Sequence, residues 1–135
     1  MTPRFLLDTN TIIYIRRGRP PEVRRQFEKL GSGEAAISII TYGELVYGIE
    51  KGMARTRSFA ELDELAASLP VLSLPKEAGR SYGAIRRDLE ARGEVIGAND
   101  LWIAAHAKAL DLVLVTNNER EFRRVAGLKV QNWIG

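Results

Sequence analysis

Four acidic residues stand beside predicted strand ends, where one edge of a sheet could gather them: Asp8, Glu44, Asp100 and Glu121. Asp8 closes the first predicted strand, and Glu44 lies one turn into the helix that follows the second. A cluster of carboxylates is unstable without a counter-charge, and oxygen ligands of this kind hold divalent cations in proteins. The spacing therefore predicts the metal site of a hydrolase.

Each acid also has a simpler structural explanation. Asp8 could be a helix N-cap, and Glu44 completes a T-x-x-E capping box with Thr41. Asp100 lies in a first helical turn, where the helix dipole favours negative charge, and Glu121 could pair with a nearby arginine. Four independent caps have no reason to share one sheet edge, however, so we favour the metal site.

Composition limits the chemistry further. The chain has 135 residues, which suits a single domain over residues 1–135, and it contains no cysteine and one histidine. Thiolate and histidine-rich metal sites are thereby excluded, and oxygen ligation favours Mg²⁺ or Mn²⁺. His106 lies six residues after Asp100, about 120° away on an ideal helix, so we expect it to be packed or on the surface rather than catalytic.

The basic residues are unevenly distributed. The formal net charge is +3, and five arginines fall within ten residues shortly after Asp8: Arg16, Arg17, Arg19, Arg24 and Arg25. A solvated helix face would explain them, but beside an acidic pocket they predict a track for a phosphate backbone. No apolar run is long enough to span a membrane and no signal peptide is evident, so we expect a cytoplasmic protein.

Strands and helices alternate along the chain, which predicts an α/β fold with a mostly parallel sheet of four to five strands covered on both faces. We predict strands over residues 4–8, 35–40, 71–74, 112–115 and 129–133. We predict helices over residues 10–17, 41–51, 55–69, 76–92, 99–109 and 119–125, with one more starting near Glu22. Asn99 can cap the helix that runs to residue 109, and the last strand should lie at an edge of the sheet. Such sheets bind ligands at the carboxyl ends of their strands.

Simple lengths place the later acids at this same edge. The helix after Asp100 carries the chain away by roughly 16 Å at 1.5 Å per residue, and the next strand returns it by a similar distance. Thr116 and Asn118 should therefore lie level with Asp100, with Glu121 just beyond. We expect four polar residues to orient the metal ligands: Thr9, Asn10, Thr116 and Asn118.

The motifs resemble those of PIN-domain toxins of the VapC type. They are FLLDTN, TYGELVYGIEKG, IGANDLWIAAHAKALDLVLVTNNEREF and GLKVQNW, and they occur in family order along the whole chain. The resemblance implies a three-layer α/β/α PIN fold and a Mg²⁺- or Mn²⁺-dependent endoribonuclease. The family's first three metal-binding acids fall on Asp8, Glu44 and Asp100. Its fourth position, commonly aspartate, is Asn118 here, so either Asn118 or Glu121 serves there, and one or two metals remain possible.

The resemblance also implies partners. Such toxins usually form homodimers, are neutralised by a VapB antitoxin, bind operator DNA through that antitoxin, and cut structured RNA, chiefly tRNA. Two other functions stay open from the residues alone. One is a PIN-like module that binds RNA or protein without cutting. The other is a small phosphatase, although Asn10 occupies the second acid position of the D-x-D-x-T signature.

Overall fold

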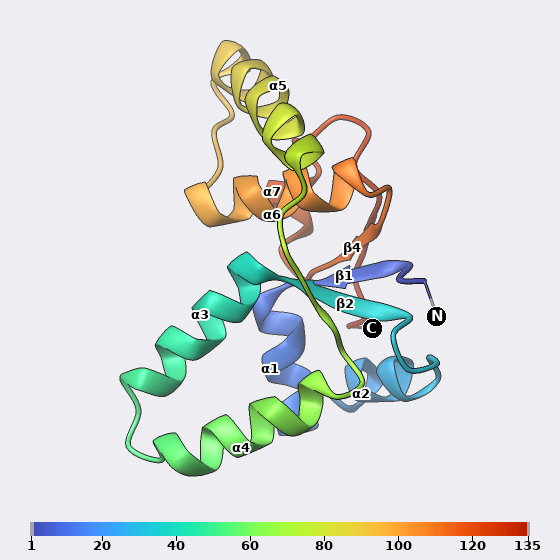
Figure 1. Ribbon diagram of the computed structural model, residues 1–135. Coiled ribbons are helices and arrows are strands. Elements are labelled where there is room, and N and C mark those ends of the chain that lie inside the picture. The colour runs from blue at the N-terminus through green and yellow to red at the C-terminus, as the bar shows by residue number, and fades with distance from the viewer. Residues whose placement is uncertain (1, 135) are drawn as a thin grey trace.

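Strands and helices alternate throughout the computed structural model, which describes residues 2–134 (Figure 1). The strands are β1 (Phe5–Leu7), β2 (Ala35–Ser38), β3 (Val71–Leu72), β4 (Val113–Val115) and β5 (Val130–Gln131). The helices are α1 (Thr9–Arg17), α2 (Pro21–Glu28), α3 (Ile39–Glu50), α4 (Arg55–Ala66), α5 (Lys76–Arg92), α6 (Ala98–Ala109) and α7 (Glu119–Phe122). No helix in this part of the chain is long and apolar enough to cross a membrane.

The five strands form one parallel sheet in the order β3-β2-β1-β4-β5. The predicted α/β fold with a parallel sheet is thus confirmed, and β5 lies at an edge as expected. The chain moves outward from β1 to β2 and β3, then returns to add β4 on the other side of β1. This reversal of strand order lies between β1 and β4, and open parallel sheets bind ligands beside such a point.

Helices cover both faces of the sheet in three layers (Figure 1). Successive residues of β1 point to opposite faces: Leu7 packs in a core with α1 to α4, whereas Leu6 packs with α5, α6 and α7. Both side chains are fully buried. The central strand therefore belongs to two apolar cores at once, which fixes the position of the residue that follows it.

The second strand ends earlier than predicted. Residues 39 and 40 are helical, because Ser38 caps α3 by accepting a hydrogen bond from the backbone N–H of Ile40 at 3.1 Å. The run AAISII reads as a continuous buried strand, but Ile39 is in fact exposed at the start of the helix. Thr41 then lies inside α3, so the predicted alternative of a capping box with Glu44 is wrong.

The helix that carries Asp100 starts one residue earlier than predicted. Gly97, not Asn99, is the N-cap of α6, and its carbonyl accepts a hydrogen bond from Leu101 N at 2.8 Å. Asn99 lies in the first turn, where its side chain is free to reach another element. The C-terminal limit of α5 agrees with the sequence, since Gly93 ends it in a left-handed conformation with φ of 66°.

The Ser38 hydroxyl has a second partner, because it lies 2.8 Å from Nδ1 of the fully buried His106. We predict that Ser38→Ala lowers the free energy of unfolding by about 2 kcal/mol, since it removes both a helix cap and the partner of a buried imidazole nitrogen. Urea denaturation measures this. Ser73→Ala, at an exposed position, is the control and should change stability little; equal effects of the two substitutions would contradict the assignment.

Candidate active site

Asp8 follows β1 directly and is almost fully buried. It is the N-cap of α1, as the simpler explanation proposed, and its Oδ1 accepts the backbone N–H of Thr11 at 2.9 Å. Burial raises the pKa of the Asp8 carboxyl, while hydrogen bonds from Thr116 and Thr11 act in the opposite direction. Capping does not fully explain Asp8, because a cap needs no acid beside it, whereas the charge of Glu44 acts on this buried carboxylate.

Glu44 lies on α3 and is held from two sides. The hydroxyl of Thr9 donates to its Oε1 at 2.6 Å, and the amide of Asn99 donates to its Oε2 at 3.4 Å. These contacts link α3 to the starts of α1 and α6. Thr9 therefore lies where it was predicted, next to an acidic side chain, whereas Asn10 is exposed in the first turn of α1.

Asp100 is the centre of the acidic cluster. Its pKa is raised from 3.8 to about 7, first by burial and then by the charges of Glu121, Glu44 and Asp8. The Glu121 carboxyl raises the pKa of Asp100 in a second way too, because an acceptor beside it favours the protonated form of Asp100. The structure thus brings all four predicted acids into one electrostatically coupled group, from four separate elements.

Glu121 and Asn118 lie beside each other at the beginning of α7. Asn118 donates its side-chain amide to Oε2 of Glu121, and the backbone N–H of Gly97 donates to Oε1 at 3.1 Å. Asn118 N in turn donates to Oγ1 of the buried Thr116 at 2.9 Å. The simpler explanation for Glu121, an ion pair with Arg124, is not borne out: Arg124 instead lies close to Glu94.

The five arginines do not form one surface. Arg16 and Arg17 line a groove of about 450 Å³ together with Thr9 and Glu44. Arg16 is half-buried, donates to Glu61 at 3.1 Å, and also lines an adjoining hollow with Arg24.

The other two arginines lie farther along the chain. Arg19 is exposed beyond α1. Arg25 lies on α2 in a different hollow, with Lys29 and Trp133. Of these five arginines, Arg16 and Arg17 are the two that line a groove with Glu44, an acid of the cluster.

Sequence reasoning missed two residues of the site. Asn99 was expected to cap a helix but contacts Glu44, and Thr11 was not singled out, although it hydrogen-bonds Asp8 and donates to Val115 O at 3.2 Å. Their positions, one residue before Asp100 and three after Asp8, are the signal that could have identified both. His106 is packed, as predicted, with burial lowering its pKa.

Comparison with known proteins identifies the fold and the chemistry. The PIN domain family model matches residues 5–128. The chain is 39% identical over 130 residues to the tRNA(fMet)-specific endonuclease VapC of Salmonella typhimurium, covering 96% of this chain and 98% of that protein. It is 38% identical over 131 residues to ribonuclease VapC2 of Haemophilus influenzae, covering 97% and 98%. The chain belongs to the PIN-domain family of VapC ribonucleases.

Solved structures agree with this assignment. The chain superposes on the crystal structure of DNA-bound VapBC from Salmonella typhimurium with a TM-score of 0.91 and 38% identity, covering 99% of this chain and 100% of that chain. Nucleases of the PIN family depend on a metal ion. The catalytic alternative is therefore the correct one, and the hypotheses of a non-catalytic module and of a phosphatase of another fold are wrong.

The donor set of this VapC-family chain fits a divalent cation in chemistry and charge. The charges of Glu121, Glu44 and Asp8 raise the pKa of the Asp100 carboxyl, and a bound cation would offset this repulsion. Among residues 2–134, no three acidic or histidine side chains are close enough as they stand to enclose one ion. Binding would therefore require side-chain adjustment, which the exposed approach through Asn99 and the half-buried Glu44 permits.

The raised pKa of Asp100 predicts how stability depends on pH without metal. Between pH 3.8 and about pH 7, Asp100 keeps its proton in the folded protein but loses it in the unfolded chain. The contribution of Asp100 to the free energy of unfolding is therefore highest at low pH, and it is lost as the pH rises through the folded pKa. We expect Asp100→Asn to raise the melting temperature in chelator by about 3 °C at about pH 8. The melting temperature of this variant should also fall less steeply than that of the wild type as the pH rises toward about 8. We discount the effect to roughly 1 kcal/mol because water reaches the group.

Thermal unfolding in EDTA across this pH range is the measurement. Asp63→Asn, which changes an exposed aspartate on α4, is the control and should follow the wild-type curve. An unchanged or lower melting temperature of Asp100→Asn at high pH would contradict the electrostatic account.

Proposed function

We propose that this chain is a Mg²⁺- or Mn²⁺-dependent endoribonuclease whose metal is held by Asp8, Glu44 and Asp100. The observation that carries the proposal is that carboxylates from separate elements meet at one sheet edge, where Asp8 follows β1, Asn99 beside Asp100 donates to Glu44, and Gly97 at the start of the same helix donates to Glu121. Glu121 completes the set, with Asn118 as the amide that orients it. When bound there, the metal polarises a phosphodiester oxygen and lowers the pKa of water.

The protein's own groups hold these carboxylates ready. Thr11 and Thr116 orient Asp8 by hydrogen bonds, and Thr9 and Asn99 hold Glu44 through one oxygen each. Such outer contacts fix the direction of ligand lone pairs and limit the entropy lost on binding. We assign Thr9 and Thr116 as positioning residues, while Asn10 has only its proximity to Asp8 in support of that role.

RNA would reach the acids along the groove that contains Glu44. Arg16 and Arg17 lie in that groove, and their charges would bind backbone phosphates on either side of the cut bond. Arg24 extends the basic lining through the adjoining hollow that Arg16 shares. Arg19 and Arg25 would contact the substrate farther from the cut, if the RNA is large and folded.

A folded RNA is the substrate that we propose, and tRNA is the first candidate because one relative is a tRNA(fMet)-specific endonuclease. Cleavage of tRNA would make the chain a toxin that stops translation. A VapB-type antitoxin would neutralise it, and operator DNA would be bound through that antitoxin, as the DNA-bound VapBC complex suggests. We also propose a homodimer and a cytoplasmic location.

The metal-site assignment predicts the effect of removing one acid. We expect Asp8→Asn to reduce RNA cleavage about 100-fold or more at saturating Mg²⁺ and to abolish growth arrest on induction, because it removes a charged ligand without changing size. Gel assays on total tRNA and growth curves measure this. Asp63→Asn should retain activity. Full cleavage by Asp8→Asn would reject the proposed role, provided that circular dichroism shows both variants folded.

Sequencing of RNA 5′ ends identifies the substrate. After brief induction, one new 5′ end in one RNA, present with the wild type and absent with Asp8→Asn, is the expected result. New ends spread over many messenger RNAs would contradict the proposal of a structured RNA target.

The basic groove predicts a salt-dependent loss of RNA affinity. In the inactive Asp8→Asn background, we expect Arg17→Ala to weaken tRNA binding and to lower the slope of log K against log salt by about 0.7–0.9, the share of one phosphate contact. Fluorescence anisotropy over a range of salt concentrations measures this. Arg80→Ala, an exposed arginine on α5, is the matched control, and an equal change in its slope would show that only net charge matters.

A further inference from the structure

The helix that carries Glu121 cannot hold its own position. Helix α7 has four residues, and isolated helices of this length are not stable because too few hydrogen bonds offset the cost of nucleation. Phe122 and Val125 bury their side chains in the core and attach the segment to the sheet. Apolar contacts of this kind attach a segment without fixing the direction of the polar side chains beside them. Asn118 and the N–H of Gly97 hold the two oxygens of Glu121 directly, so the position of Glu121 depends on what holds the loop and the segment around it.

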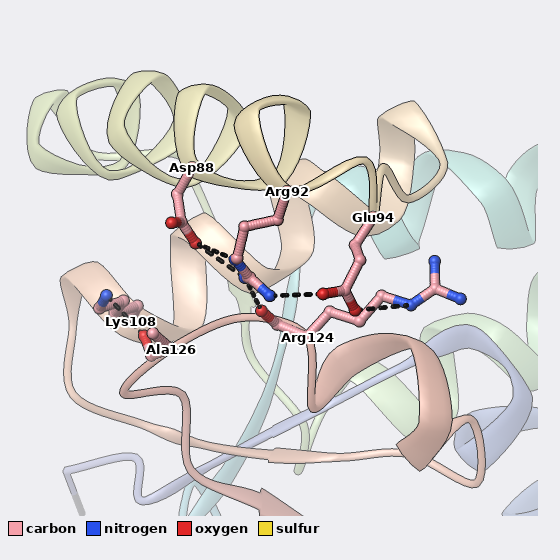
Figure 2. Close-up of polar contacts among 6 residues, drawn as sticks. All are labelled: Asp88, Arg92, Glu94, Lys108, Arg124 and Ala126. Carbon is pink, nitrogen blue, oxygen red and sulfur yellow. Dashed lines mark hydrogen bonds and ion pairs between the residues drawn. The ribbon is translucent and has the colours of Figure 1, made fainter.

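Arg92 is placed to do this from the last turn of α5. Its Nη2 donates to the backbone carbonyl of Arg124, three residues after Glu121, and also to Oδ2 of Asp88 at 2.8 Å. Its Nη1 donates to Oε1 of Glu94 at 2.8 Å. Figure 2 shows this guanidinium lying between the two carboxylates and the carbonyl. A single planar group thus joins α5, the loop after it and the end of the α7 segment.

The same segment is fastened at two more points. The Arg124 side chain reaches back to the loop before α6, where it donates to the carbonyl of Val95 at 3.0 Å and lies 4.0 Å from Glu94. Lys108 on α6 donates to the carbonyl of Ala126 at 2.7 Å (Figure 2). Residues 124–126 are therefore tied to α5, to the loop and to α6 by side chains that themselves lie outside the acidic cluster.

The contacts of Arg92 and Arg124 connect to the acidic cluster through the loop before α6. The loop that Arg92 and Arg124 hold also contains Gly97, whose N–H donates to Glu121. Gly97 is the N-cap of α6, three residues before Asp100. Helix α6, which follows the loop, carries Asp100, and α7 carries Glu121. The Arg92 contacts join the loop to the segment that follows α7.

We propose that Arg92, with Arg124 and Lys108, forms a positioning clamp that sets Glu121 against Asp100 and so sets the affinity of the site for its divalent cation. The inference rests on the proposed function, because it assumes that Glu121 serves the metal. Arg92 touches neither substrate nor metal in this account, and it acts only through the segment that it holds.

Exposure explains why a clamp of this kind affects position more than stability. The side chains of Arg92 and Asp88 are 38% and 50% exposed, and ion pairs in such surroundings contribute little to folding. The contact with the Arg124 carbonyl is different, because it restrains the backbone three residues after Glu121. Loss of Arg92 should therefore leave the folded state intact and widen the range of positions that Glu121 samples.

The test is calorimetric titration of the metal-free protein with MnCl₂ alone, repeated in the four members of a double-mutant cycle: wild type, Arg92→Ala, Glu121→Gln and the double variant. We expect Arg92→Ala to weaken Mn²⁺ binding about 10-fold, the lower end for loss of an outer partner of a metal ligand. In the Glu121→Gln background the same change should alter affinity by less than about 2-fold, because its target is gone.

Arg86→Ala is the matched control. Arg86 lies on the same helix and pairs with Glu90, four residues on, at 3.1 Å, as Arg92 pairs with Asp88, four residues before it. Its hydrogen bonds to Glu90 and Tyr82 stay within α5. Arg86→Ala should bind Mn²⁺ like the wild type. Arg92→Lys, which keeps the charge but has no planar fork, should resemble Arg92→Ala; recovery of wild-type affinity in this variant would reject the clamp geometry.

Hydrogen exchange provides a readout that does not depend on metal. In chelator, amides of residues 119–126 should exchange faster in Arg92→Ala than in Arg86→Ala, while amides of β1 and β4 stay unchanged. Unchanged exchange in this segment would overturn the clamp even if Mn²⁺ binds the wild type. An equal loss of Mn²⁺ affinity with and without Glu121 would overturn the route through Glu121. Failure of the wild type to bind Mn²⁺ would instead reject the proposed function itself, and this inference with it.

Discussion

The mutual repulsion of carboxylates at one edge of the sheet is the constraint on which the rest of the structure depends. The charges of Glu121, Glu44 and Asp8 add to the effect of burial and raise the pKa of the Asp100 carboxyl to about 7. Left alone, such a cluster would push its members apart toward water. It persists because each acid is attached to an element whose position is fixed by the apolar cores on either face of the sheet. The cores thus hold in place a group of charges that a cation is suited to complete.

The order of the strands explains why the acids meet where they do. Asp8 leaves β1 and Thr116 leaves β4, and these two strands are neighbours although more than a hundred residues separate them in sequence. Asp8 N donates to Val115 O at 3.0 Å, so the two strand ends are fastened side by side. The remaining acids come from helices that start or end at this same edge. Strand order, rather than any local motif, creates the site.

Much of this could be predicted from sequence, for identifiable reasons. Alternating apolar runs and helical stripes predict all five strands and the parallel sheet, and acids directly after strands predict the cluster. The end of β2 was not predictable from hydrophobicity, because the hydroxyl of Ser38 competes with the strand for the chain. Asn99 and Arg92 were not predictable as partners of distant groups either. Their contacts join residues far apart in the sequence, such as Arg92 and the carbonyl of Arg124, and neither helical nor strand periodicity relates such positions.

The spread of the four acids along the chain has a consequence during synthesis. Asp8 leaves the ribosome 113 positions before Glu121. A nascent chain that has released β1, β2 and their helices holds Asp8 and Glu44 but lacks the other half of the donor set. The site of this ribonuclease thus stays incomplete until β4 and α7 have been synthesised, because the two central strands, β1 and β4, can pair only then.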